Sequence, residues 1–130
     1  MKIEQTSIVE YEDVDTAFRM KLPALFQRFQ RAALHHSDSV GLDTQTMVAA
    51  GAVWILNRIR VRIQRMPEYR ESVTVTTWHK GSVGFRAGRG FLVRCGDATV
   101  AAAASQSLAS GASEQAASIE ETSSSLEEMS

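Results

Sequence analysis

The sequence predicts an α+β fold in which an antiparallel sheet wraps around one long central helix, followed by a helical extension. Apolar residues recur every three or four positions over residues 22–39, whereas apolar and cationic residues alternate over residues 53–64. The composition changes near residues 101–105, and 22 of the last 30 residues are Ala, Ser or Glu. We therefore expect a folded domain at residues 1–104 and a separate helical tail at residues 105–130.

The N-terminal part of the domain predicts one strand followed by the central helix. Residues 2–12 alternate loosely between polar and apolar side chains, which is typical of a strand. Turn and capping residues such as Asp15 come next. The helix at residues 22–39 carries a bulky apolar stripe that includes Phe29, whereas Arg28 falls outside this stripe. We expect the stripe to form the centre of the core.

The second part of the domain predicts four strands. After a loop at residues 43–45, the strand at residues 53–64 is apolar on one face and carries arginines on the other. The strands and turns that follow are expected at residues 71–80, Gly81–Ser82, 83–94, Gly96–Asp97 and 98–103. One helix cannot cover its own apolar stripe, whereas a curved antiparallel sheet can, and this arrangement is the hotdog fold.

The apolar runs, the cysteine content and the histidine positions exclude several classes of protein. No apolar run approaches the ~20 residues that cross a bilayer, and the N-terminus is too polar for a signal peptide. The single Cys95 excludes an internal disulfide, so a reducing, cytoplasmic location is expected. His35 and His36 are adjacent, and on a helix their side chains point in directions about 100° apart, which is poor for chelating one metal. We expect neither a metal nor another cofactor.

Three motifs in the predicted sheet point to one family. A W-hydrophobic-L strand stands at Trp54–Leu56, and a segment R-x-P-x-x-x-E-x-V-x-V-x-T-W stands at Arg65–Trp78. A strand close to R-D-F stands at Arg89–Phe91, with Gly90 in the place of the Asp. In these motifs, and over residues 3–104 as a whole, the chain resembles the first hotdog half of acyl-acyl-carrier-protein thioesterases.

The resemblance implies an enzyme, a thiolester hydrolase that releases fatty acids from acyl carrier protein in fatty acid biosynthesis. Members of the family with two hotdog halves place their Asp, Asn and His machinery in the second half, which this chain lacks. We therefore expect an incomplete thioesterase whose activity on its own is open. Because its sheet edges are unpaired, a homodimer is expected. The alternative is a non-catalytic acyl-binding or oligomerising hotdog module.

Two residues are candidates for catalysis. Many single-hotdog thioesterases carry an acidic residue in a D-x-x-G-H context, and the nearest counterpart here is Asp15, without the Gly and the His. Its alternative role is to cap a turn or a helix. His36 is a candidate general base, or it faces the opening of an acyl pocket. Its alternative role is structural, either packed against the sheet edge or solvated.

The candidate substrate-binding residues are cationic or aromatic. Arg58, Arg60 and Arg62 form a cationic face that would steer the acidic acyl carrier protein, unless it is an ordinary solvated face. Trp54 and Phe29 would contact the acyl chain, unless they belong only to the core. Nucleic acid is not expected as a partner, because the net charge is −1 and no aromatic stacking platform accompanies the arginines.

The tail repeats apolar or small residues at alternating spacings of four and three, as in a heptad seam. Glu114, Glu121 and Glu128 recur every seven residues. In this register, residues 105–130 resemble the methylation helix of methyl-accepting chemotaxis proteins, which implies that these glutamates are methyl-accepting positions. A fragment for chemotaxis signal transduction is therefore an alternative function. Whether the fusion of the two segments is biological or an artefact stays open.

Overall fold

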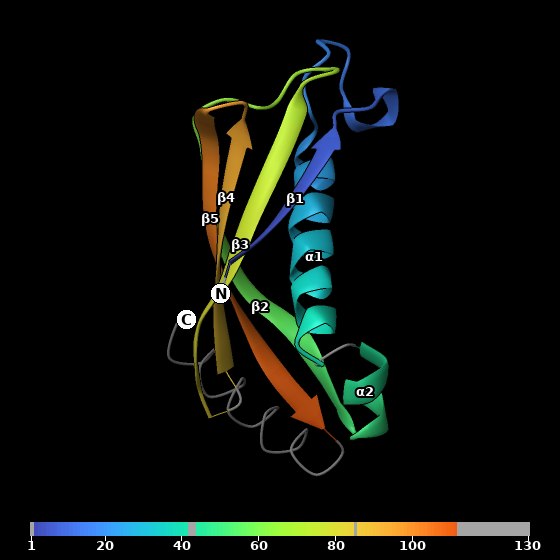
Figure 1. Ribbon diagram of the computed structural model, residues 1–130, viewed down its shortest axis with the longest axis vertical. Coiled ribbons are helices and arrows are strands. Elements are labelled where there is room, and N and C mark those ends of the chain that lie inside the picture. Colours follow the sequence, from blue (N-terminus) through green and yellow to red (C-terminus); the bar gives the residue numbers. More distant parts are fainter. Residues whose placement is uncertain (1, 42–43, 85, 112–130) are drawn as a thin grey trace, which may run out of the picture.

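The computed structural model describes residues 2–41, 44–84 and 86–111 of the 130-residue chain (Figure 1). In chain order its elements are β1 (Lys2–Ile8), the 3₁₀ turn η1 (Tyr11–Asp13), α1 (Leu22–Ser39), α2 (Thr44–Ala49), β2 (Ala52–Ile63), β3 (Ser72–Val83), β4 (Arg86–Cys95) and β5 (Ala98–Gly111). The predicted order of strand, long helix and four strands is confirmed. The short helix α2 replaces part of the expected loop. Neither α1 nor α2 has both the length and the apolarity needed to cross a membrane.

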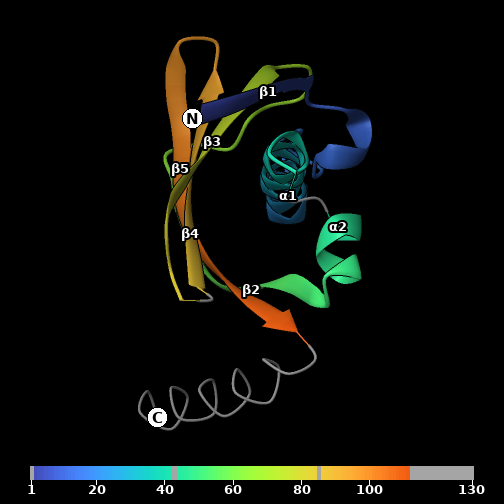
Figure 2. The same cartoon turned by 60° about the horizontal axis from the view of Figure 1, so that its bottom comes forward.

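The strands form one antiparallel sheet in the order β1-β3-β4-β5-β2. The sheet bends around α1, which lies on its concave side (Figure 2). β2 follows the helices in the chain but pairs with β5, so β2 forms one edge of the sheet and β1 forms the other. The predicted hotdog fold is confirmed.

The core lies between α1 and the concave face of the sheet, which we call the inner face. The buried apolar side chains of α1, β3 and β4 include Ala24, Leu25, Phe29, Ala32, Val73, Val75, Phe91 and Val93. Phe29 packs on Phe91 with ring centroids 4.7 Å apart. Removing these side chains from water is the main force that wraps the sheet around the helix.

A buried ion pair fixes the start of α1. Arg28 Nη2 lies 2.7 Å from Asp13 Oδ2, and the same guanidinium donates to Ser7 Oγ and to the carbonyl of Ile8. Arg28 is therefore buried, although it lies outside the apolar stripe of the helix. The hydrogen bond from Arg28 holds the pKa of Asp13 below its ordinary value. This network ties β1 and η1 to α1.

Strand β5 is longer than the sequence analysis predicted. It pairs with β2 as far as Gly111, so residues 105–111, which we had assigned to the helical tail, belong to the sheet. Their Ser-rich composition does not favour a strand, but pairing with β2 along the whole segment, and with β4 as far as Leu108, overrides this weak local preference. The rest of the predicted tail, residues 112–130, lies outside the described residues.

The connection between β3 and β4 also differs from the prediction. Gly81 and Ser82, expected as the turn, belong to β3, and the register of the pairing shifts between His79 and Gly81. The turn follows at Gly84, which has a φ of +61°. A residue without a side chain adopts this left-handed conformation at little cost.

β2 has the two faces that the alternation predicts. Ile59 and Val61 pack against the core from the inner face. The exposed arginines of the opposite, outer face are Arg58, Arg60 and Arg62. The register with β5 shifts between Leu56 and Arg58, as in a β-bulge. The bulge places Leu56 on the inner face with Ile59, although the two residues are three positions apart.

Gly90 lies on the outer face of β4, under the ring of Trp78. A Cβ at this position would collide with the indole. Lys2 covers the same ring, with Nζ 5.0 Å from its centroid. This packing gives a steric reason for Gly where the R-D-F motif has Asp.

Candidate functional site

A polar cluster lies on the inner face of the sheet, beneath the C-terminal part of α1. Thr77 and His79 continue the inner row of buried valines on β3, and Arg89 stands two positions before Phe91 on β4. The register pairs Thr77 with Phe91 and His79 with Arg89. Because opposite residues of antiparallel strands project to the same face, Thr77, His79 and Arg89 share the inner face with the core.

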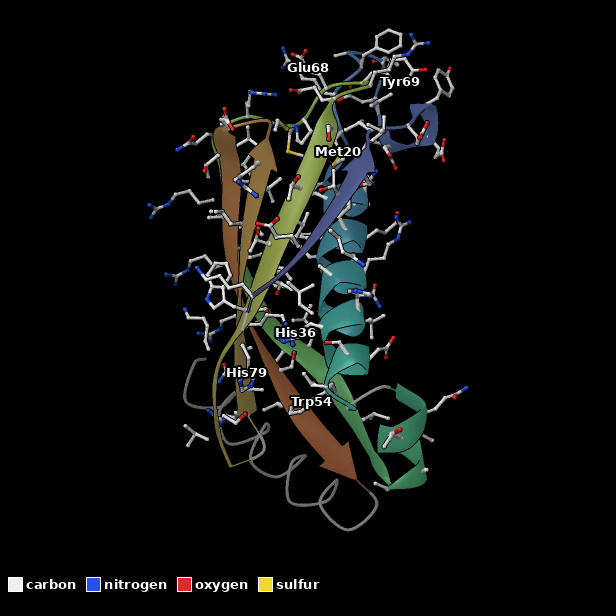
Figure 3. The ribbon with its side chains drawn as sticks, in the orientation of Figure 1. Met20, His36, Trp54, Glu68, Tyr69 and His79 are labelled. Atoms are coloured by element: carbon white, nitrogen blue, oxygen red, sulfur yellow. The ribbon has the colours of Figure 1, made fainter. Side chains whose placement is uncertain are left out.

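His36 of α1 completes this cluster from the helix side and is 5% exposed. Its Nδ1 lies 2.8 Å from Arg89 Nη1, and the same Nη1 donates to Thr77 Oγ1 at 3.2 Å. The Thr77 hydroxyl in turn donates to the carbonyl of Gly90 at 3.0 Å. Figure 3 shows His36 near the lower end of α1, with His79 and Trp54 in the same half of the ribbon.

The contact with Arg89 fixes the tautomer of His36. A guanidinium can only donate, so His36 Nδ1 accepts the hydrogen bond and the ring proton resides on Nε2. Burial, and after it the positive charge of Arg89, lowers the pKa of His36 below its ordinary value. At neutral pH, His36 is therefore an uncharged imidazole that carries its proton on Nε2.

Arg89 is a partly buried cation with neutral partners. Burial lowers the pKa of its guanidinium, but an arginine remains protonated at neutral pH. Within the described part of the chain, its hydrogen-bond partners are His36 and Thr77, and no carboxylate forms an ion pair with it. The cluster thus presents one cationic donor and one neutral donor on the inner face, next to the apolar core.

Of the two catalytic candidates, only His36 lies in this cluster. Asp15 Oδ1 accepts hydrogen bonds from the backbone N–H groups of Ala17 at 2.9 Å and Arg19 at 3.2 Å. These bonds close the turn before α1, which is the alternative role left open for Asp15. A helix rises about 1.5 Å per residue, so Asp15 and His36 lie toward opposite ends of the 18-residue α1. The structure does not bring the two candidates together.

The five candidate binding residues lie in three different environments. Arg58, Arg60 and Arg62 are exposed on the outer face of β2. Trp54, near the start of β2, is 40% exposed, whereas Phe29 is 2% exposed and packs within the core. The sheet therefore separates the arginines from Phe29, and the two groups cannot contact one part of a ligand together.

A hollow lies between β1 and α1, apart from the polar cluster. This hollow of about 250 Å³ is lined by Gln5, Thr6, Ser7, Arg28, Arg31 and Val75. Arg28 is already paired with Asp13 there. None of the residues predicted to act in catalysis or substrate binding lines this hollow.

The candidate methyl-accepting residues Glu114, Glu121 and Glu128 lie outside the described residues. The chemotaxis alternative depends on them and on the helical tail, so it remains a prediction.

Sequence reasoning missed Thr77 and the role of Arg89, which it used only as part of a motif. A signal was available in the spacing. Arg89 stands two and four positions before Phe91 and Val93, so in a strand its side chain projects to the same face as two core residues. A cation in an apolar row is the unusual feature that identifies a candidate site.

Two of three comparisons relate the chain to known proteins. Residues 1–119 match the family model of the acyl-ACP thioesterase N-terminal domain. The search of curated protein sequences gave no match. Among solved structures, an acyl-ACP thioesterase from Bacteroides thetaiotaomicron superposes with a TM-score of 0.81 at 22% identity, covering 85% of this chain and 46% of that one. The 12:0-ACP thioesterase from Umbellularia californica gives 0.77 at 23% identity, covering 88% and 47%.

A shorter protein shares the same fold. The 1,4-dihydroxy-2-naphthoyl-CoA thioesterase from Synechocystis has a TM-score of 0.77 at 12% identity, over 85% of this chain and 83% of that one. The chain thus spans less than half the length of the two acyl-ACP enzymes and most of the length of the shorter one. At these identities the structural likeness shows the hotdog fold, and the family model shows the relationship. The chain belongs to the acyl-ACP thioesterase N-terminal domain family.

Proposed function

We propose that this chain is a thioesterase module that takes part in hydrolysing fatty acyl thioesters carried by acyl carrier protein, in fatty acid biosynthesis. The observation that carries the proposal is the family match over residues 1–119. The inner-face cluster of His36 and Arg89 supports it, because donors beside an apolar surface suit an acyl group with a polar end.

Thioester hydrolysis needs a base that activates water and donors that stabilise the oxyanion. His36 and Arg89 supply donors, but His36 has no free acceptor nitrogen while Arg89 occupies Nδ1 and the proton resides on Nε2. Among the described residues, no carboxylate hydrogen bonds to His36 to convert it into a base. The base would then come from outside the described residues of this module, and a second copy of this chain paired with it is the source that we propose.

The edge strand β2 is the surface for that second copy. β2 pairs with β5 on one side, and its other edge has no strand partner within the described residues. Val53 and Ile55 are exposed beside this open edge on the outer face, and Trp54 and Leu56 are exposed on the inner face. An exposed apolar edge strand favours pairing with another strand. We expect a homodimer joined along β2.

Acyl carrier protein approaches from the outer face of β2. Arg58, Arg60 and Arg62 project there in alternate positions. Carrier proteins are strongly acidic, so complementary charge would raise the association rate and orient the acyl group toward the module.

The test is release of the carrier thiol from dodecanoyl-acyl carrier protein by the purified full chain. We expect the chain to release thiol faster than buffer alone does. The rate of release should rise with the fraction of the chain that is dimeric. The matched control is a dodecanoyl amide of the same carrier, which binds alike but resists hydrolysis. An absence of turnover by a verified dimer would contradict the proposal.

The second candidate function is a non-catalytic acyl-binding module. The observation that favours it is the cluster itself, which among the described residues supplies hydrogen-bond donors and no base. Saturable binding of the acyl carrier without thiol release would support this candidate over the enzyme.

A further inference from the structure

Arg89 has no described ion pair, unlike three other arginines of the described chain. Arg28 pairs with Asp13 at 2.7 Å, Arg65 with Glu71 at 2.7 Å and Arg94 with Glu4 at 3.0 Å. Arg89 faces the interior, yet its described partners are the neutral groups His36 and Thr77. Removing a cation from water without a counter-ion is unfavourable, so the site favours an anionic oxygen.

Donors of the cluster remain available to a ligand. Among the described residues, the single buried side-chain nitrogen or oxygen without a partner is Arg94 Nε. The Nε and Nη2 groups of Arg89 and the Nε2 group of His36 are therefore not sealed inside the core. A guanidinium with two free N–H directions matches the two oxygens of a carboxylate.

An uncovered apolar surface adjoins these donors. In the register of the sheet, Arg89 lies opposite Ser105, which lies opposite Ile59 of β2. Leu56 and Trp54 continue the inner face of β2 beyond Ile59. Leu56 is 58% exposed and Trp54 is 40% exposed, because α1 ends at Ser39 and does not cover them. Figure 2 shows the start of β2 below α1 and beside α2.

The geometry points to a fatty acid site in which Arg89 and His36 bind the carboxylate and the acyl chain lies along Leu56 and Trp54. The identity of the ligand as a fatty acid rests on the proposed function, since hydrolysis of the thioester generates this carboxylate. The site itself rests on the donors and the apolar surface. It predicts that the product binds to the module and competes with the acyl substrate.

The test compares dodecanoate with dodecanol by isothermal titration calorimetry on the full chain, below the aggregation concentration of either ligand. We expect dodecanoate to bind more tightly than dodecanol. Arg89→Gln should weaken dodecanoate binding by about 10- to 100-fold, as expected for charge-assisted hydrogen bonds, and leave dodecanol binding unchanged. The matched control is Arg94→Gln, which removes an arginine from the outer face of the same strand and should change neither affinity.

A second measurement does not depend on the folding of a variant. Dodecanoate labelled with ¹³C at the carboxyl is titrated with pH in the presence of the unaltered chain. Among the described residues, the titratable groups that face the carboxylate are Arg89 from β4, His36 from α1 and His79 from β3, and none of them is acidic. We therefore expect the bound carboxyl to titrate below the free acid.

Two results overturn the site: equal affinity for dodecanoate and dodecanol, or a bound carboxyl that titrates at or above the free acid. These readouts are independent of hydrolysis. If dodecanoate binds as described but thiol release fails, the proposed catalytic function is wrong and the carboxylate site stands. If thiol release succeeds and dodecanoate binding is unselective, the carboxylate site is wrong and the proposed function stands.

Discussion

The ion pair between Asp13 and Arg28 is a single contact on which the start of α1 depends. Its two side chains are 7% and 10% exposed, and Arg28 Nη2 lies 2.7 Å from Asp13 Oδ2. Asp13→Asn leaves the guanidinium buried without its counter-charge. We expect a loss of about 3–5 kcal/mol in the free energy of unfolding, measured by urea denaturation at pH 7. Asp97→Asn in the exposed β4–β5 turn is the control and should change stability little.

The same pair predicts how stability depends on pH. The pKa of Asp13 is lowered in the folded protein, mainly by the hydrogen bond from Arg28. The folded state therefore binds fewer protons than the unfolded state, and the pair stabilises the fold above the unfolded pKa of about 4. This stabilisation is lost as the pH falls through the lowered pKa. The loss of stability on acidification should be smaller in Asp13→Asn than in the unaltered chain. If the free energy of unfolding depends on acid pH equally in both, the role assigned to the pair is wrong.

Phe29 of α1 packs on Phe91 of the sheet, with ring centroids 4.7 Å apart. Phe29→Ala leaves a cavity at the centre of the core and should lower the free energy of unfolding by about 3–5 kcal/mol. Leu34→Ala on the same helix is the control, because Leu34 is 44% exposed. Equal losses for the two variants in chemical denaturation would mean that Phe29 is not a core residue.

At the scale of the elements, strand β2 connects the fold to the proposed partners. The double variant Arg60→Glu/Arg62→Glu reverses charge on its outer face without altering the inner face. We expect weaker binding of acyl carrier protein at low salt and a smaller dependence of the affinity on salt concentration. Lys21→Glu/Arg31→Glu, an equal change of charge at the N-cap and in the middle of α1, is the control. Similar losses in both variants would indicate a general charge effect and contradict docking on β2.

The elements differ in how well the sequence predicts them. The helix at residues 22–39 was predicted with its observed bounds. Its bulky apolar residues recur every three or four positions, which matches the repeat of an α-helix and not the two-residue repeat of a strand. The length of β5 was not predicted, because a run of Ala and Ser has no strong preference until β2 and β4 pair with it. Helix α2 has six residues, too few to produce a periodic pattern.

The candidate site was predicted only in part. His36 was selected as a histidine on the helix, and the structure places it in the inner-face cluster. Its partner Arg89 comes from a strand 53 positions away, and no local pattern pairs residues at that separation. Asp15 was selected from its nearness to the helix start, where a turn also requires an acidic cap. Residue types and local spacing reveal the faces of elements, but the register of the sheet decides which side chains meet.

At the scale of the whole molecule, the open edge of β2 predicts a homodimer. Ile55→Lys places a charge on the exposed outer face of this edge and should shift the chain toward monomer in sedimentation equilibrium. Val83→Lys at the end of β3 is the control, because Val83 is 82% exposed and distant from β2 in the strand order. A dimer that resists Ile55→Lys would place the interface elsewhere.

The position of a bound acyl chain tests the account most directly. Intermolecular nuclear Overhauser effects between dodecanoate and the full chain report which side chains contact the methylene groups. We expect contacts with the indole of Trp54 and the methyl groups of Leu56, on the inner face of β2. Contacts with Val75 and the other residues of the hollow between β1 and α1 instead would contradict the account.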